Sequence, residues 1–301
     1  MEHKKDVGNL IFKYPKLSEE MIYKDIYLSE ITNFMVNIFD SKPWKDHYFL
    51  CGGTSLSKCY KITNRLSEDI DISIFGFSIS KGKKTIRDIS LLIDEVEKSG
   101  KIVIIHRDSL WLEQRTFLNC KFKYKGLEFA FDVKAINNIF DHKDINKQPM
   151  WNIIDKHSKT AKASTTLIPV VDINFIVAEK LLVFHKKYIA NSSDINDNYE
   201  VNRLFRHVYD IFMIFDKKLI EVNDTSFVLI NKLFLEISKL EKNFDTPLNK
   251  INVFQESFFN DNKKILRTII DNECYEKVSV QKIITFYKVI GEKINILFDK
   301  I

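Results

Sequence analysis

Two aspartates that alternate with isoleucines, Asp69 and Asp71, have the spacing in this sequence that points most directly to chemistry. In a β-strand, residues i and i+2 lie on the same face, about 6.6 Å apart along the chain. Carboxylates that close repel each other unless a cation lies between them, and such a pair can bridge two divalent metals. The pattern therefore predicts a metal site, with a solvated strand face as the alternative for an isolated Asp-x-Asp.

A Gly-Gly-Thr-Ser turn precedes this pair, between a short apolar run at residues 48–51 and an expected helix at 56–63. Glycines let backbone N–H groups approach an anion, hydroxyls add donors, and a helix N-terminus contributes a positive dipole. The Walker A spacing is missing, and an ordinary tight turn is the alternative. The expected phosphate-binding residues of this turn are Gly52, Gly53, Thr54 and Ser55. Lys58, one turn into the expected helix, could also reach a phosphate, with a solvated lysine as the alternative.

A third carboxylate, Asp132, ends an alternating segment at residues 127–133 whose apolar side chains face one way. Its own side chain shares the opposite face of the expected strand. If this strand lies in the sheet beside the strand of Asp69 and Asp71, the three carboxylates form one cluster. A strand-end aspartate that faces water is the alternative.

The second half of the chain carries a lysine, Lys180, on the apolar face of an expected helix, close to Phe184. Burying a lysine without a partner costs several kcal/mol. We therefore expect an anion beside it, either a carboxylate such as Asp210 or a nucleotide phosphate. For Asp210 the alternative partner is Arg206 of the same helix, in a weak ion pair.

The elements that must position these residues are strands in the first half and helices in the second. Periodicity predicts helices at 18–40, 56–63, 85–99, 172–189, 201–217, 227–240 and 278–298, and strands at 48–51, 70–74, 101–106, 117–124 and 127–133. Lys125-Gly126 is typical of a hairpin turn. We expect an α/β (α+β) fold, with a mixed sheet flanked by helices and a mainly helical C-terminal half. The polar stretch 156–164 separates predicted domains at 1–165 and 166–301.

Composition limits the class of protein. The chain has 301 residues, 45% hydrophobic and 29% charged, which is typical of a globular protein and excludes a disordered tail protein. The net charge of +5 is too evenly spread to identify a partner. The four cysteines show no metal-ligand spacing, which fits a reducing compartment. No apolar run approaches the roughly 20 residues of a membrane span, so we expect a cytoplasmic protein without a membrane partner.

Two segments together resemble the signature of the AbiEii/AbiGii-type nucleotidyltransferase toxins, members of the DNA polymerase β-like nucleotidyltransferase superfamily. They are Cys-Gly-Gly-Thr-Ser-Leu-Ser-Lys at residues 51–58 and Arg-Leu-Ser-Glu-Asp-Ile-Asp-Ile-Ser at residues 65–73. Later motifs match in part, through Glu-Lys-Leu at 179–181 and the helix from Arg206 to Asp210, where His207 replaces the more usual acid. The resemblance covers roughly residues 48–215.

The resemblance implies an enzyme that moves a nucleoside monophosphate from an NTP to an acceptor hydroxyl and releases pyrophosphate. It implies that the glycine turn holds the triphosphate and that Asp69, Asp71 and Asp132 are catalytic and bind two Mg²⁺ ions (or Mn²⁺). It also implies that the helical domain closes the nucleotide cleft, where Lys58, Lys180 and Asp210 assist nucleotide binding. An RNA acceptor (tRNA included) or a protein acceptor, and a cognate antitoxin, are the expected partners. Six lysines against two acids in residues 156–187 slightly favour nucleic acid. The alternative is an inactive nucleotide-binding module that acts through protein contacts.

Overall fold

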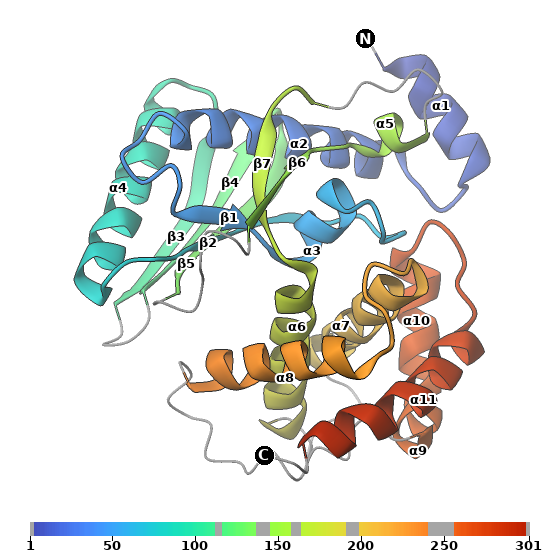
Figure 1. Ribbon diagram of the computed structural model, residues 1–301. Helices are drawn as coiled ribbons and strands as arrows, with labels where there is room; N and C mark the ends of the chain where they lie inside the picture. Colours follow the sequence, from blue (N-terminus) through green and yellow to red (C-terminus); the bar gives the residue numbers. More distant parts are fainter. Residues whose placement is uncertain are drawn as a thin grey trace. The chain divides into compact units, whose positions relative to one another are not determined.

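The computed structural model describes residues 3–111, 116–136, 145–157, 164–190, 199–239 and 256–298. The chain divides into two compact units, one formed by residues 1–61 and 66–171 and the other by residues 62–65 and 172–301 (Figure 1). This division differs from the predicted boundary at 165/166, because residues 167–171 form a strand of the sheet. Most of the polar stretch at 156–164 lies outside the described residues. The mixed α/β class is confirmed.

Seven strands in the described part of the first unit form one mixed sheet, in the order β3-β4-β5-β2-β1-β7-β6. Their bounds are β1 Tyr48–Leu50, β2 Asp69–Ile74, β3 Val103–Trp111, β4 Thr116–Tyr124, β5 Leu127–Ala135, β6 Ile145–Pro149 and β7 Leu167–Val171. The β2–β5 and β1–β7 pairs are parallel and the other pairs are antiparallel. The two strands that carry the predicted carboxylates, β2 and β5, are therefore direct neighbours.

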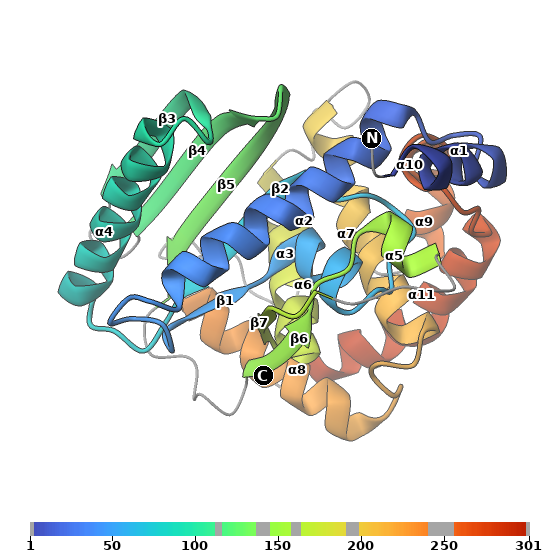
Figure 2. The ribbon, with the colours of Figure 1, turned by 90° about the horizontal axis from the view of Figure 1, so that it is seen from above.

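Two helices of the first unit, α2 (Glu19–Phe39) and α4 (Ile79–Lys98), pack on one face of this sheet. The helical segments are α1 Lys4–Lys13, α2 Glu19–Phe39, α3 Gly52–Thr54, the π-helix η1 Ser55–Cys59, α4 Ile79–Lys98 and α5 Ile153–His157. Apolar side chains of α2 and α4 share one buried cluster with Ile70, Ile72, Phe131 and Val133 of the central strands. Figure 2 shows α2 and α4 passing in front of the strands. The acidic side chains of β2 and β5 alternate with these core residues, so they lie on the opposite face.

Local signals explain where several elements begin and end. The Ser18 side chain accepts a hydrogen bond from the Met21 N–H (3.1 Å), which caps α2 at the predicted position. Lys125 and Gly126 have φ angles of 50° and 87°, as a two-residue hairpin turn requires. The helix α4 begins before the predicted residue 85, since Ser78 caps a first turn whose polar composition conceals the apolar periodicity.

The second unit is helical in its described part. Its helices are α6 Ile173–Ala190, α7 Tyr199–Asp216, α8 Asp224–Lys239, α9 Glu256–Asp261, α10 Lys263–Glu273 and α11 Val280–Phe298. Aromatic side chains fill its core, where Phe205 stacks on Phe258 and the Tyr287 hydroxyl donates to the Val208 carbonyl (2.7 Å). Residues 62–65 join this unit through a β-bridge between Arg65 and Cys274. The four predicted helices are confirmed, while α9 and α10 were not predicted.

Candidate functional site

The parallel register of β2 and β5 places Asp71 directly opposite Asp132. Directly opposite residues point to the same face of a sheet, and Asp69 shares that face because it precedes Asp71 by two positions. The structure thus brings the three predicted carboxylates onto one face of two adjacent strands. All three are partly exposed, whereas the alternating Ile70 and Ile72 are fully buried on the other face.

An asparagine extends this polar row by one strand. Asn119 on β4 lies opposite Asp132 in the antiparallel β4–β5 register, and its side-chain amide donates a hydrogen bond to Asp132 Oδ1. Burial raises the pKa of Asp132, and the nearby Asp69 charge raises it further, against the opposing effects of Asn119 and of Lys134. Asp132 therefore binds a proton more readily than a solvated aspartate does.

The glycine turn meets this carboxylate row at Gly52. Gly52 has a φ of +66°, and a Cβ built on it would overlap the carboxylate of Asp71. The backbone connects the same two segments, because the Cys51 N–H donates to the Asp71 carbonyl (2.9 Å). A residue other than glycine would need both an unfavourable φ and a displaced Asp71. The predicted phosphate turn and the predicted metal carboxylates are thus adjacent in the first unit.

The hydroxyls of this turn have roles that differ from the predicted ones. The Thr54 hydroxyl donates to the Asp69 carbonyl, and the Ser55 hydroxyl donates to the Gly52 carbonyl (2.9 Å). Both side chains are fully buried, so these hydroxyls hold the turn against β2 and do not face outward as phosphate donors would. The partly exposed residues of the turn are Gly52 and Gly53.

Backbone groups are therefore the donors that the turn offers to an anion. The helical segment starts at Gly52, and its N-cap residue, Cys51, makes no side-chain cap hydrogen bond. The first N–H groups of a helix have no acceptor within the helix, and glycine allows an anion to approach them closely. The geometry favours Gly52 and Gly53 over the hydroxyl side chains as phosphate ligands.

Lys58 also differs from its prediction as a phosphate-contacting lysine. Its Nζ is fully buried and donates to Asp25 Oδ1 (2.6 Å) and to the Asp25 carbonyl (2.9 Å). The other carboxylate oxygen of Asp25 accepts a hydrogen bond from the Ile153 N–H (2.7 Å). Burial lowers the pKa of Lys58, and Asp25 counteracts the shift. A buried ammonium needs such a partner, so Lys58 joins η1 to α2 and α5 inside the first unit.

In the second unit, Asp210 lies between two cations. Arg65 donates to both of its carboxylate oxygens (2.9 and 2.5 Å), and Lys180 Nζ donates to Oδ2 (2.8 Å). Burial by itself would raise the pKa of Asp210, but Arg65 and Lys180 outweigh burial and hold it well below its usual range. Of the two partners expected for Lys180, the structure contains the carboxylate. The contact of Lys180 with a nucleotide stays a prediction.

The alternative reading, an ion pair between Arg206 and Asp210 within one helix, is wrong. Arg206 Nε lies 2.5 Å from a carboxylate oxygen of Glu273, on α10. Asp210 is fully buried, so its carboxylate contacts the buried side chains of Arg65 and Lys180. Arg206, on the same helix, is half-exposed and points to a different partner.

Sequence reasoning missed three residues that hold these groups: Asp25, Asn119 and Arg65. Asp25 occupies a buried position of α2 beside Ile26. A carboxylate on the apolar face of a helix could have indicated a buried cation as its partner. Asn119 faces Asp132 only through the strand register, which local sequence does not determine. Arg65 belongs to the quoted motif, but its partner lies 145 residues further along the chain.

The donor set suits magnesium chemically, although the described residues form no complete metal cage. In the described ranges, no group of three or more His, Cys, Asp or Glu side chains is arranged to hold a metal ion. Magnesium usually binds through one or two carboxylates together with water and substrate phosphates. Two aligned aspartates beside a phosphate-accessible turn therefore fit Mg²⁺ that arrives with a nucleotide.

Comparison with known proteins adds to this geometry. The family model described as "Nucleotidyl transferase AbiEii toxin, Type IV TA system" matches residues 33–279. No curated protein matches. Among solved structures, JHP933 from Helicobacter pylori is 13% identical with a TM-score of 0.45, covering 94% of this chain and 95% of that chain. MenT4, nucleotidyltransferase toxin Rv2826c from Mycobacterium tuberculosis H37Rv, is 14% identical with a TM-score of 0.35, covering 94% of this chain and 99% of that chain.

No helix in the described ranges combines the length and the apolar character that crossing a membrane requires. The match to the family model includes the glycine turn, the carboxylates of β2 and β5, and the Arg65–Asp210–Lys180 cluster. It spans most of the chain, and the chain therefore belongs to the AbiEii family of nucleotidyltransferase toxins of type IV toxin–antitoxin systems.

Proposed function

We propose that this nucleotidyltransferase transfers a nucleoside monophosphate from an NTP to an acceptor hydroxyl with the help of Mg²⁺, and that the acceptor is RNA, tRNA included. The observation that carries the proposal is the register of β2 and β5, which sets Asp71 beside Asp132 on the face that Asp69 shares. The glycine turn supports it, since Asp71 lies against Gly52.

In the reaction, the acceptor oxygen forms a bond to the α-phosphorus of the NTP, and the bond from that phosphorus to the oxygen bridging to the β-phosphate breaks. Pyrophosphate leaves with the electrons of the broken bond. Asp69 and Asp71 would hold two Mg²⁺ ions, or Mn²⁺ ions. When bound, these ions neutralise the triphosphate charge and favour ionisation of the acceptor hydroxyl.

The chain's own groups provide positioning and proton transfer. The backbone N–H groups of Gly52 and Gly53 would bind phosphate oxygens at the start of the helix. Asp132 is the group that would take the acceptor proton, because burial and the Asp69 charge raise its pKa. Its place opposite Asp71 would also let it help to hold a metal. Asn119 would orient Asp132 through the hydrogen bond to Oδ1. No covalent enzyme intermediate is needed.

Two features of the chain support the choice of acceptor and the cellular setting. Residues 156–187 contain six lysines and two acids, and although Lys180 is buried against Asp210, the remaining excess of lysine favours a polyanionic acceptor over a protein. The family's type IV toxin description supports a cognate antitoxin as partner. We place the reaction in the cytoplasm, where NTPs and RNA are available, without a membrane partner.

The test is transfer of label from each of the four α-³²P-labelled NTPs, with Mg²⁺ or Mn²⁺, to purified tRNA, total RNA or cell-extract protein. Wild type is compared with Asp71→Asn, which removes one carboxylate at nearly constant volume. Labelled RNA that depends on metal and on Asp71 supports the proposal. Label on protein alone would assign a protein acceptor, and nucleotide binding without any transfer would favour an inactive nucleotide-binding module.

A further inference from the structure

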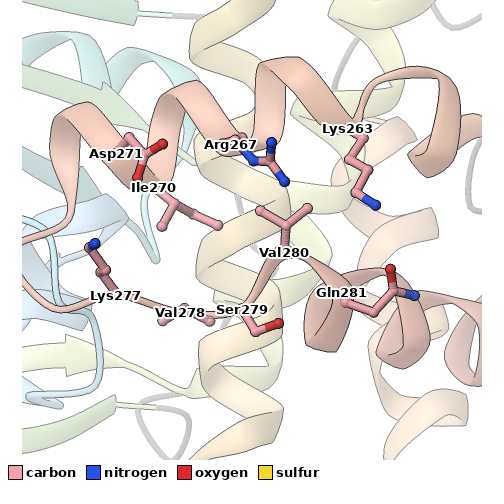
Figure 3. A pocket seen from close by; sticks show the side chains of 9 residues that line it. All are labelled: Lys263, Arg267, Ile270, Asp271, Lys277, Val278, Ser279, Val280 and Gln281. Atoms are coloured by element: carbon pink, nitrogen blue, oxygen red, sulfur yellow. The ribbon is translucent and has the colours of Figure 1, made fainter.

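The described part of the second unit contains an open pocket of about 270 Å³ between α10 and the start of α11. Figure 3 shows Lys263 and Arg267 extending from α10 toward the segment 277–281, and Lys277 extending from that segment toward α10. The pocket lies within one unit and contains none of the residues of the carboxylate site. It is a separate feature of the molecule.

The charge of this pocket is strongly unbalanced. Three cationic side chains line it, against the single carboxylate of Asp271. Among the described residues, Lys263, Arg267 and Lys277 form no ion pair, in contrast to Lys282 nearby, which pairs with Asp216 (2.5 Å). Three cations around a cavity that holds one carboxylate repel one another, and an anion in the cavity relieves this repulsion. The side-chain chemistry therefore points to an anionic ligand.

The backbone adds to the positive potential. The Ser279 side chain caps α11 by accepting a hydrogen bond from the Lys282 N–H (3.4 Å), and Val280 begins this 19-residue helix at the pocket wall. Helix N-termini favour negative charge within the first turn. The dipole acts on the same space as the three cationic side chains.

We propose that this pocket binds phosphate groups of an RNA backbone. A phosphate accepts the forked N–H groups of an arginine and the point charge of a lysine, and both kinds of donor are present. No aromatic side chain lines the pocket, so the stacking platform that a base requires is absent from it. The pocket is also open to solvent at two exposed cations, Arg267 and Lys277, as a continuous polymer requires.

This inference deepens the proposed function, because it identifies a surface that binds the RNA acceptor. It rests on the proposed function in one respect, that the acceptor is RNA. Binding can be measured without NTP and without Mg²⁺, so transfer is not part of the readout. The Asp71→Asn variant, which is expected to lose transfer, should bind RNA as wild type does. Failure of the transfer reaction and failure of RNA binding are thereby distinguishable.

The experiment measures fluorescence anisotropy of a 5′-fluorescein-labelled 20-nucleotide RNA, titrated with full-length protein at several salt concentrations. The pocket variant is Lys263→Gln/Arg267→Gln. The matched control is Lys232→Gln/Lys264→Gln, which removes two exposed cations of the same unit that do not line the pocket. Thermal melting of both variants checks that each remains folded.

We expect the pocket variant to bind RNA at least about 10-fold more weakly than wild type. The slope of log affinity against log salt should fall by about 1.4, the amount for two lost contacts to single-strand phosphates. The control should stay within about 2-fold of wild type. Equal RNA affinity of the folded pocket variant and the control overturns the proposal.

A competition arm separates an RNA backbone from free phosphate. Inorganic phosphate and an unlabelled NTP are added to the wild-type complex at equal ionic strength, alongside unlabelled RNA. Displacement by unlabelled RNA at micromolar concentration, with little effect of either small anion at the same concentration, supports the backbone assignment. Displacement of the probe by micromolar inorganic phosphate or NTP would instead assign the pocket to a free anion and contradict the proposal.

Discussion

The carboxylate of Asp71 occupies the space that a side chain on Gly52 would need. This close approach links two segments that the chain separates by a helix and a loop, and it is reinforced by the hydrogen bond from the Cys51 N–H to the Asp71 carbonyl. A phosphate held at the start of the helix would consequently lie next to a carboxylate that can bind a metal. The nucleotide and metal parts of the proposed site depend on one contact.

Replacing Gly52 with alanine should disrupt both parts together. A φ of +66° costs a non-glycine residue about 1–2 kcal/mol, and the new Cβ would push the Asp71 carboxylate away. We expect a lower melting temperature and loss of transfer. The control is Gly8→Ala, inside α1 with open space around it, which should stabilise the protein by about 0.5–1 kcal/mol. A Gly52→Ala variant with wild-type transfer would separate Asp71 from the nucleotide site.

Asp132 should make stability depend on pH in a defined direction. Its folded-state pKa is raised by burial and by Asp69, so the folded protein binds this proton more tightly than the unfolded chain. Stability is therefore lost as pH rises through the folded-state pKa. Asp132→Asn should melt above wild type at pH 7, and the difference should shrink as pH falls toward 3.8. An Asp132→Asn variant that melts below wild type at pH 7, or a difference in melting temperature that does not change with pH, would show that the ionised Asp132 does not destabilise the folded protein.

Lys58 should prove to be a structural residue. Lys58→Met leaves the buried Asp25 carboxylate without its cation, at a cost of about 3–5 kcal/mol. The double variant Lys58→Met/Asp25→Asn removes both charges and keeps an acceptor for the Ile153 N–H, so it should recover part of that loss. Chemical denaturation measures the stabilities, and calorimetry measures NTP affinity of the folded double variant. Affinity reduced 10-fold there would restore a phosphate-binding role to Lys58.

Asp210 should dominate the acid sensitivity of the second unit. Arg65 and Lys180 hold its pKa well below the usual range despite burial, so its contribution to stability is present above the unfolded-state pKa near 3.8 and is lost as pH falls. Asp210→Asn should cost about 3–5 kcal/mol at neutral pH, because two buried cations lose their counter-charge. Melting from pH 7 to pH 3 should show this difference narrowing below about pH 4. A constant difference across that range would contradict the assignment.

Lys180 carries a separate prediction about activity. Lys180→Ala leaves the bidentate Arg65–Asp210 pair in place, so the fold should survive. If Lys180 also contacts the nucleotide, the variant should raise the Michaelis constant for NTP or lower the transfer rate by at least about 10-fold, equivalent to roughly 1.4 kcal/mol. Kinetic parameters within about 2-fold of wild type would restrict Lys180 to its ion pair with Asp210.

The elements with strong periodicity could be predicted from sequence, together with the residues that they present. Alternating isoleucines set the faces of β2, and the alternation at residues 127–133 set those of β5. The short α5, β6 and β7 were missed, because five residues carry too little periodic signal. A helix was expected at 56–63 after the glycine turn. The observed segment is a π-helix at Ser55–Cys59, so it ends earlier and has a different hydrogen-bond pattern from the expected helix.

The composition of the site was harder to predict than its location. Residue types and spacing pointed to Asp69, Asp71 and the glycine turn. The position of Asp132 beside Asp71 depends on parallel pairing between strands about 60 residues apart. Loop closure and core packing decide the register of such a pair. The Lys180–Asp210 contact was expected, but two other buried partners were missed for a related reason. They are Asp25, which binds Lys58, and Arg65, which binds Asp210; local spacing contains no information about partners so distant in sequence.

The central claim is that Asp69, Asp71 and Asp132 bind metal together with the nucleotide held at Gly52. Its most direct test is a titration with Mn²⁺ in the presence of a non-hydrolysable NTP. The electron paramagnetic resonance signal of the free ion reports how much Mn²⁺ is bound. Asp71→Asn is compared with Asp108→Asn, an exposed aspartate on β3 of the same sheet that pairs with His106. The account predicts at least about 10-fold weaker Mn²⁺ binding for Asp71→Asn and wild-type binding for Asp108→Asn. Equal Mn²⁺ binding by wild type and a folded Asp71→Asn would contradict it.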